Sequence, residues 1–317
     1  MYVKFWGTRG SIATSLPAEA IKQKIFQALE GAAGLNLADE AVLKRYMERL
    51  PFTIWGTAGG NTPCLEIRSG NQLLILDAGS GLRLLGLELM QNGFAKGHQR
   101  ADILISHTHW DHINGFPFFR PAFIPHNHFT FHSPFPDLAE RLAQQQQPNF
   151  FPVPLNYMSA ALEFNTLAES QWYQLGNFKI YPMRLVHPGE TYGYRIEAAG
   201  SSLVWATDSE YKQADRASTE NYINFFQNAD LLVFDAQYTL SEVLDKPDWG
   251  HSSAIMGAEF ASRAGVKKLA LAHHDPTSSD EKIWSDREQA EAYLQRRQKN
   301  QPACEVLVAY DGLTLEL

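Results

Sequence analysis

Residues 107–112 read His-Thr-His-Trp-Asp-His and directly follow a short apolar segment, ADILIS, that is typical of a buried strand. Side chains two residues apart in an extended chain lie on one face, so His107 and His109 can reach one ion. Asp111 and His112 follow as the chain turns, and we expect them to face a second, adjacent position. This concentration of histidine and aspartate is typical of a metal site. The fold must therefore bring further ligands to the end of this strand.

Four other apolar segments also end in a histidine or an aspartate. These residues are Asp77 after LLIL, His187 after MRLV, Asp208 after LVWAT and His273 after LALA. Taken singly, each is more typical of a surface loop. Taken together, they favour one shared site at one edge of the sheets.

The order of the segments predicts the fold. Strand-like segments come first in neighbouring runs and later alternate with helical ones, which predicts two mixed β-sheets packed together with helices outside. We interpret residues 1–317 as one domain. Residues 17–50 interrupt it with two amphipathic helices, for which Pro17 and Asp39 are start signals and Gly34 is a break. Further helices are expected at 82–91, 137–147, 252–264 and 280–299.

The composition limits which binding partners and which cellular compartment we expect for this protein. Hydrophobic residues make up 44% of the chain and the net charge is −8. No basic run exceeds two residues, which argues against a long nucleic acid as partner and is neutral about small anionic substrates. No apolar run approaches the roughly 20 residues of a membrane helix. The start of the chain reads as a strand rather than a signal segment, and the two cysteines give no disulfide framework, so we expect a cytoplasmic protein with no membrane partner.

The motifs LILDAGSGLR, HTHWDH, LVHPG, WATDSE, WGHSSA and LAHHDP, in this order and spacing, resemble the metallo-β-lactamase superfamily. Within it, the chain is most similar to ribonuclease Z and the small cyclic phosphodiesterases. The segments GTRGSI and AGGNTPCLEI also resemble the opening loops of that group. The likeness covers nearly the whole chain except residues 17–50. It implies an α+β fold, a four-layer αββα sandwich of two mixed β-sheets with helices outside. It also implies a site at the shared edge of the sheets.

The resemblance implies a site for two divalent metal ions. The implied ligands are His107, His109 and His187 for one ion, Asp111, His112 and His273 for the other, and Asp208 as a bridge. Asp77 would orient a ligand histidine. His274 also follows its strand, but the resemblance places the ligand at His273. Because all these donors are nitrogen or oxygen, zinc, manganese and iron all stay open, and zinc is the ion that we expect first.

Three residues are expected to have catalytic roles. Asp111 would orient a hydroxide that bridges the two ions, and Asp77 would act through the histidine that it orients. His251, in the WGHSSA motif, resembles the histidine that contacts the scissile phosphate in the ribonuclease Z branch and can protonate the leaving oxygen. Ser252 alone is explained equally well as a helix cap, but capping does not explain His251.

These roles predict a metal-dependent hydrolase of a small phosphodiester substrate, with a cyclic nucleotide as one candidate. Three alternatives stay open: a nuclease that processes the 3′ end of tRNA, a hydrolase of lactones, thioesters or β-lactams, and a non-catalytic, metal-stabilised module that binds a nucleotide. The oligomeric state also stays open, with a homodimer as one candidate.

An aromatic run borders the histidine motif. It consists of Trp110, Phe116, Phe118, Phe119 and Phe123. Such rings can stack on a nucleobase, but we expect most of them to be buried in the core.

Overall fold

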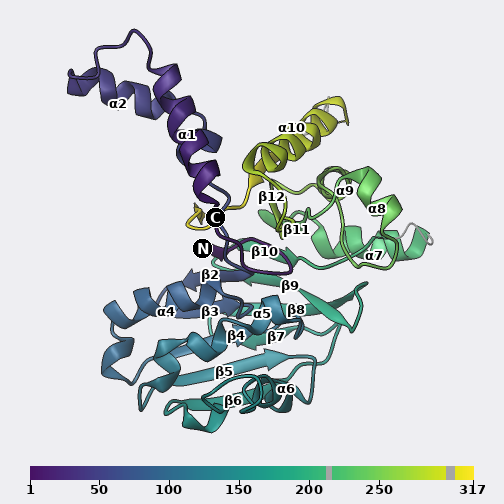
Figure 1. The fold of residues 1–317 in the computed structure, drawn as a ribbon. Helices are drawn as coiled ribbons and strands as arrows, with labels where there is room; N and C mark the ends of the chain where they lie inside the picture. The colour runs from purple at the N-terminus through teal and green to yellow at the C-terminus, as the bar shows by residue number, and fades with distance from the viewer. Residues whose placement is uncertain (212–215, 298–303) are drawn as a thin grey trace.

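A computed structural model describes residues 1–211, 216–297 and 304–317, and in it two seven-stranded β-sheets pack face to face (Figure 1). The first sheet has the order β14-β1-β2-β3-β4-β5-β6 and the second β13-β12-β11-β10-β9-β8-β7. The strands of the first sheet are β1 (Tyr2–Gly7), β2 (Cys64–Ser69), β3 (Gln72–Leu76), β4 (Arg100–Leu104), β5 (His128–Ser133), β6 (Ala161–Thr166) and β14 (Thr314–Glu316). Those of the second are β7 (Tyr173–Leu175), β8 (Phe178–Leu185), β9 (Thr191–Ala198), β10 (Ser201–Ala206), β11 (Leu231–Asp235), β12 (Lys268–Ala272) and β13 (Glu305–Val308).

Both sheets are mixed in the same way. Strands β14, β1, β2 and β3 pair antiparallel, and β3 to β6 pair parallel. In the second sheet, β7 to β10 pair antiparallel and β10 to β13 parallel. Parallel strands end at one edge of their sheet, where open α/β sheets bind ligands. Each sheet therefore carries its ligand-type residues to an edge formed by its parallel half.

The core lies between the sheets and beneath the helices of the second sheet. Alternate residues of β11 separate these layers: Val233 faces the core between the sheets, whereas Leu232 and Phe234 face the helices. Phe131 and Trp205 approach the inter-sheet core from opposite sheets and are almost fully buried. Aromatic rings of this size contribute much of the apolar area that folding removes from water.

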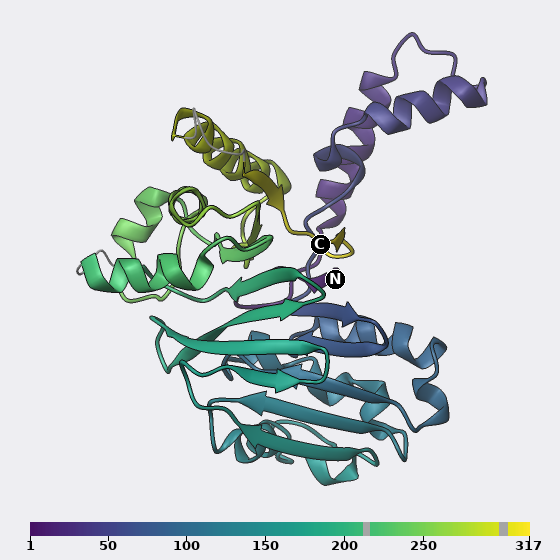
Figure 2. The same ribbon diagram turned by 180° about the vertical axis from the view of Figure 1, so that it is seen from behind.

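Helices cover the outer faces, as Figures 1 and 2 show, so the predicted four-layer αββα sandwich is confirmed. The helices are α1 (Ala18–Gly31), α2 (Glu40–Arg49), α3 (Phe52–Trp55), α4 (Gly81–Gln91), α5 (Trp110–Ile113), α6 (Leu138–Gln145), α7 (Arg216–Phe226), α8 (Leu240–Asp245), α9 (Ala254–Ala264) and α10 (Asp280–Arg297). Helix α4 packs on the first sheet through Leu82, Leu85 and Leu89, while α9 and α10 pack on the second. The end of the helix predicted over 280–299 lies outside the described residues.

Helices α1 and α2 occupy the predicted interruption and project from the two sheets as an arm (Figures 1 and 2). Asp39 caps α2 by accepting a hydrogen bond from the Ala41 amide, as the sequence indicated. Neither helix buries a residue, and Phe26 and Leu29 are more than half exposed. The arm is therefore held at its base, where Lys24 forms a 2.9 Å ion pair with the buried Asp280 at the start of α10.

Among the described helices, none combines the length and the apolar character that crossing a membrane requires.

Candidate metal centre

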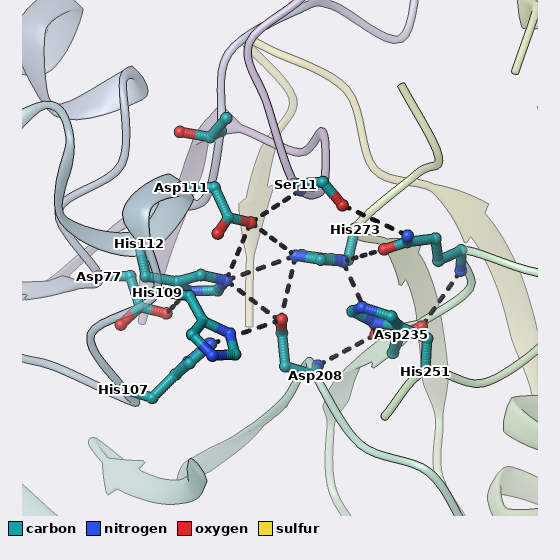
Figure 3. Close-up of polar contacts among 12 residues, drawn as sticks. Ser11, Asp77, His107, His109, Asp111, His112, Asp208, Asp235, His251 and His273 are labelled. Atoms are coloured by element: carbon teal, nitrogen blue, oxygen red, sulfur yellow. Dashed lines mark hydrogen bonds and ion pairs between the residues drawn. The ribbon is translucent and has the colours of Figure 1, made fainter. Parts of the chain in front are cut away.

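Strand ends and loops from both sheets bring the predicted ligands together at the shared edge. Figure 3 labels all of them except His187. Among the described residues, four groups of side chains have donor atoms that all lie within 4.8 Å of one another. Two of these groups contain His251, and the other two consist of predicted metal ligands alone. One is His107, His109 and His187, and the other is Asp111, His112, Asp208 and His273. All seven predicted metal ligands thus fall into these two groups, which meet at Asp208.

The first group consists of imidazoles alone. Nε2 of His187 lies 3.0 Å from Nδ1 of His109, and the rings of His107 and His109 meet edge to face at 4.5 Å. His107 is buried, whereas His109 is exposed. Burial lowers the pKa of His107 well below its usual value, which keeps the ring neutral and leaves a lone pair for a cation.

The second group combines two carboxylates with two imidazoles. Nε2 of His273 lies 3.2 Å from Oδ2 of Asp111, and Nε2 of His112 lies 3.4 Å from the same oxygen. The two Nε2 atoms are 3.4 Å apart. All the side chains of this group are buried. Oxygen and nitrogen donors that converge on one point in this way suit a divalent cation.

Asp208 lies between the two groups and turns one oxygen to each. Its Oδ1 is 3.2 Å from Nε2 of both His112 and His273, whereas its Oδ2 is 3.7 Å from Nε2 of His107. Within the described part of the chain, Oδ1 of Asp208 and Nε2 of His107 are buried without a hydrogen-bond partner. Buried polar atoms are seldom left without partners, so these two fit a pair of cations.

Three site residues at strand ends share an uncommon backbone conformation. Asp77, Asp208 and His273 have φ angles of 58°, 59° and 57°, in the left-handed region. A residue other than glycine reaches this region at a cost of order 1 kcal/mol, and such residues cluster at functional sites. Since each follows a different parallel strand, the same backbone turn is used three times at this edge.

In three of the ligand-type histidines, the second ring nitrogen is held by an acceptor. Nδ1 of His112 donates to Asp77 (2.8 Å), that of His187 to the Gly250 carbonyl (2.8 Å) and that of His273 to Gln237 (2.9 Å). Because these acceptors carry no hydrogen to give, a hydrogen sits on Nδ1 of each ring, and Nε2 is the nitrogen that faces the centre and would bind an ion. Asp77 thus occupies the orienting position that the sequence predicted.

Carboxylates raise the pKa values of both histidines in the second group. Burial disfavours a charged His112, but the carboxylates of Asp208, Asp111 and Asp77 outweigh it and raise the pKa of this imidazole well above its usual value. Burial likewise opposes the charge of His273, and Asp208 and Asp111 raise its pKa to about 9. A group that holds protons this tightly provides a favourable place for a cation.

His251 lies beside both groups and is bonded to a carboxylate that the sequence analysis missed. Its ring centroid is 5.2 Å from that of His187 and 5.1 Å from that of His273. Its Nδ1 donates to Oδ2 of Asp235 at 2.8 Å. Asp235 ends the apolar strand β11, so the same signal that indicated Asp77 and Asp208 was present. Ser253, not Ser252, caps α9, while Ser252 donates its amide hydrogen to Asp235.

The opening loop closes over the second group. The Ser11 amide donates to Oδ2 of Asp111 at 2.8 Å. A Cβ at Gly10 would lie 2.4 Å from Nδ1 of His273, so only glycine allows this approach. The buried Arg9 fixes the loop by donating to the carbonyls of Gly59, Asp275 and Ser278. Sequence reasoning found the loop but not these contacts.

His274 faces away from the centre. It is buried and donates from Nε2 to the Ala309 carbonyl at 2.9 Å. Burial lowers its pKa to about 3, so it stays neutral. His273 is therefore the residue of this pair whose side chain belongs to the two donor groups.

The chain belongs to the β-lactamase superfamily: the family model described as "Beta-lactamase superfamily domain" matches residues 73–274, well over half of it. A crystal structure of the metallo-β-lactamase fold protein YhfI from Bacillus subtilis matches with a TM-score of 0.64 at 19% identity, covering 100% of this chain and 98% of that one. This likeness supports the fold.

Curated relatives match over shorter segments. An uncharacterized protein of Mycobacterium leprae is 32% identical over 113 residues, which is 35% of this chain and 37% of the relative. A ribonuclease Z of Prochlorococcus marinus is 36% identical over 77 residues, 24% of this chain and 22% of the relative. The chain thus spans well under half of either relative, and the predicted resemblance to the ribonuclease Z branch is confirmed. The chain therefore has the metallo-β-lactamase fold and belongs to that superfamily.

Proposed function

We propose that the protein hydrolyses a small phosphodiester, with a cyclic nucleotide as the leading candidate. The observation that carries the proposal is the pair of Asp235 and His251, which adds a proton carrier beside two groups of metal donors. Phosphodiester hydrolysis needs such a carrier because an alkoxide is a poor leaving group.

The donor groups fit two divalent ions. His107, His109 and His187 would hold one ion, Asp111, His112 and His273 the other, and Asp208 would contribute one oxygen to each. Zinc suits this nitrogen and oxygen donor set, and manganese and iron are the alternatives. When bound, two such ions lower the pKa of water and neutralise charge on a phosphoryl group.

The chain's own residues would position the reactants. Oδ2 of Asp111 is fixed by the Ser11 amide, so its carboxylate is oriented to accept a hydrogen bond from an attacking water. The water oxygen would form the new bond to phosphorus and pass one proton to solvent along its hydrogen bond to Asp111, while the bond to the leaving oxygen breaks. His251, whose Nδ1 hydrogen is held by Asp235, would give a proton from Nε2 to that leaving oxygen.

The relative named ribonuclease Z supports phosphoester chemistry and also keeps a tRNA 3′-processing nuclease in view. A net charge of −8 favours the small substrate, because binding to a long nucleic acid relies on basic residues that neutralise phosphates.

The test is an activity panel on the purified protein with zinc or manganese added. It contains bis(p-nitrophenyl) phosphate, cyclic nucleotides, a precursor tRNA, a lactone and nitrocefin. We expect turnover of the first two, and a loss of about 100-fold or more in kcat for His251→Ala. Turnover of the lactone or nitrocefin alone, or of none of the compounds, would overturn the proposal. Cleavage confined to the precursor tRNA would assign the nuclease instead.

A further inference from the structure

A largely apolar pocket of about 670 Å³ opens directly beside the metal centre. We call it the aromatic pocket and define it by Ile12, Trp110, Phe118, Arg141, Gln145 and Phe150. Its lining also includes Thr108, from within the histidine motif, and Ser11, whose amide is bonded to Asp111. A substrate held by the metal donors would therefore extend into this pocket.

The aromatic rings of this pocket are more exposed than the sequence led us to expect. Phe116 and Phe119 are fully buried, as predicted, but Trp110 is 83% exposed and Phe118 is 52% exposed. Phe150, which follows α6 and comes from a different part of the chain, is 77% exposed. Large exposed apolar side chains gathered at one place mark a binding surface more often than a structural need.

The polar groups of the pocket restrict the chemical class of ligand that it can hold. Oε1 of Gln145 is buried and has no hydrogen-bond partner within the described residues, so it can accept a hydrogen from a ligand. Arg141 is already engaged: it donates to Asp137 and to Thr108, and its guanidinium stacks over Phe135. Among the described residues that line the pocket, Arg141 is the one cation, and Asp137 already neutralises its charge. A flat, uncharged ring with an N–H donor would find aromatic surfaces to stack on and an acceptor in Gln145.

We propose that the aromatic pocket holds the nucleobase of the substrate. The inference rests on the proposed phosphodiesterase function and specifies its substrate class. Trp110 and Phe150 would stack on the base, and Gln145 would accept one of its N–H groups. A pocket of this volume lies within the range of small-molecule sites.

The test compares a cyclic nucleotide with the same cyclic phosphate on a base-free methyl riboside. We expect the native protein to show a lower KM for the nucleotide. Trp110→Ala and Phe150→Ala should each raise that KM about tenfold or more, with much less effect on kcat. Trp172→Ala is the matched control, because Trp172 is also half exposed but lines a different hollow, against Tyr181. Equal KM values for the two substrates, or no change in either pocket variant, would overturn the inference.

A binding measurement keeps this test separate from catalysis. We expect a nucleoside monophosphate to bind the purified protein in equilibrium dialysis, and to bind Phe150→Ala more weakly. Since Phe150 is largely exposed, this variant is expected to fold. If no phosphodiester is hydrolysed but this difference is found, the proposed function fails and the base site stands. If phosphodiesters are hydrolysed but Phe150→Ala binds the nucleotide as the native protein does, the base site fails alone.

Discussion

Oδ2 of Asp235 lies 2.8 Å from Nδ1 of His251, and the same oxygen accepts the amide hydrogen of Asp208 at 3.1 Å. One carboxylate thus connects the proposed proton carrier to the residue between the two donor groups. Its other oxygen accepts the amide hydrogens of Gln237 and Ser252. Every position around Asp235 is therefore a donor, which only an ionised carboxylate satisfies.

This relationship predicts that Asp235→Asn lowers kcat by about 100-fold. In either orientation, the amide NH₂ group of asparagine would face two hydrogen-bond donors, and His251 would lose its alignment. Because the two residues act as one unit, we expect Asp235→Asn combined with His251→Ala to be no slower than His251→Ala alone.

The control for this substitution is Asp102→Asn. Asp102 also accepts from a histidine, His132, at 2.9 Å, but it lies in β4 within the first sheet. Replacing the Asp102 carboxylate by an amide should therefore leave kcat unchanged. Steady-state kinetics on the four variants would contradict the account if the effects of Asp235→Asn and His251→Ala simply multiplied.

Gly250→Ala should reduce metal content and activity together. Gly250 has a φ angle of 80°, and an added Cβ would lie 2.1 Å from Nδ1 of His187, which its own carbonyl holds. The added Cβ would push the His187 ring away from its place in the first group of donors. Measuring the metal content per chain and kcat of the variant tests this prediction.

Gly200→Ala separates this effect from backbone strain. Gly200 has the same φ angle of 80°, but nothing lies within 4 Å of the added Cβ. Both variants carry a similar conformational cost, of order 1 kcal/mol. Equal losses of metal in the two variants would show that strain, not contact with His187, is responsible.

The arm should contribute little to the stability of the sheets. Phe26 is 57% exposed on α1, whereas Phe131 is fully buried in β5. We expect Phe26→Ala to change the free energy of unfolding by less than about 0.5 kcal/mol, and Phe131→Ala to lower it by about 3–5 kcal/mol. Urea titration measures both. A large loss for Phe26→Ala would mean that the arm is packed in solution against a surface that a single chain does not provide.

Much of the fold and site could be predicted because strand ends carry their own signal. Asp77, Asp208 and His273 each follow an apolar run, and the parallel strands bring such residues to one edge. Asp235 carries the same signal but was overlooked because it is followed by another strand-like stretch, Ala236-Gln237-Tyr238, rather than by a recognisable loop.

Other features depend on tertiary contacts that a linear pattern does not encode. Helix α7 was missed because its sequence, RASTENYINFF, combines residues of modest helix propensity and is stabilised by packing Phe226 against the second sheet. The exposure of Trp110 was also unpredicted, since an aromatic residue beside a buried motif is usually core. The ion pair at the base of the arm joins Lys24 and Asp280, which are far apart in sequence.

The central claim is that Asp208 joins two metal sites, and metal analysis of the purified protein tests it most directly. We predict about two divalent ions per chain for the native protein and a marked loss for Asp208→Ala, since each oxygen of Asp208 faces a different donor group. Two ions per chain in both proteins, or none in the native protein after reconstitution, would contradict the account.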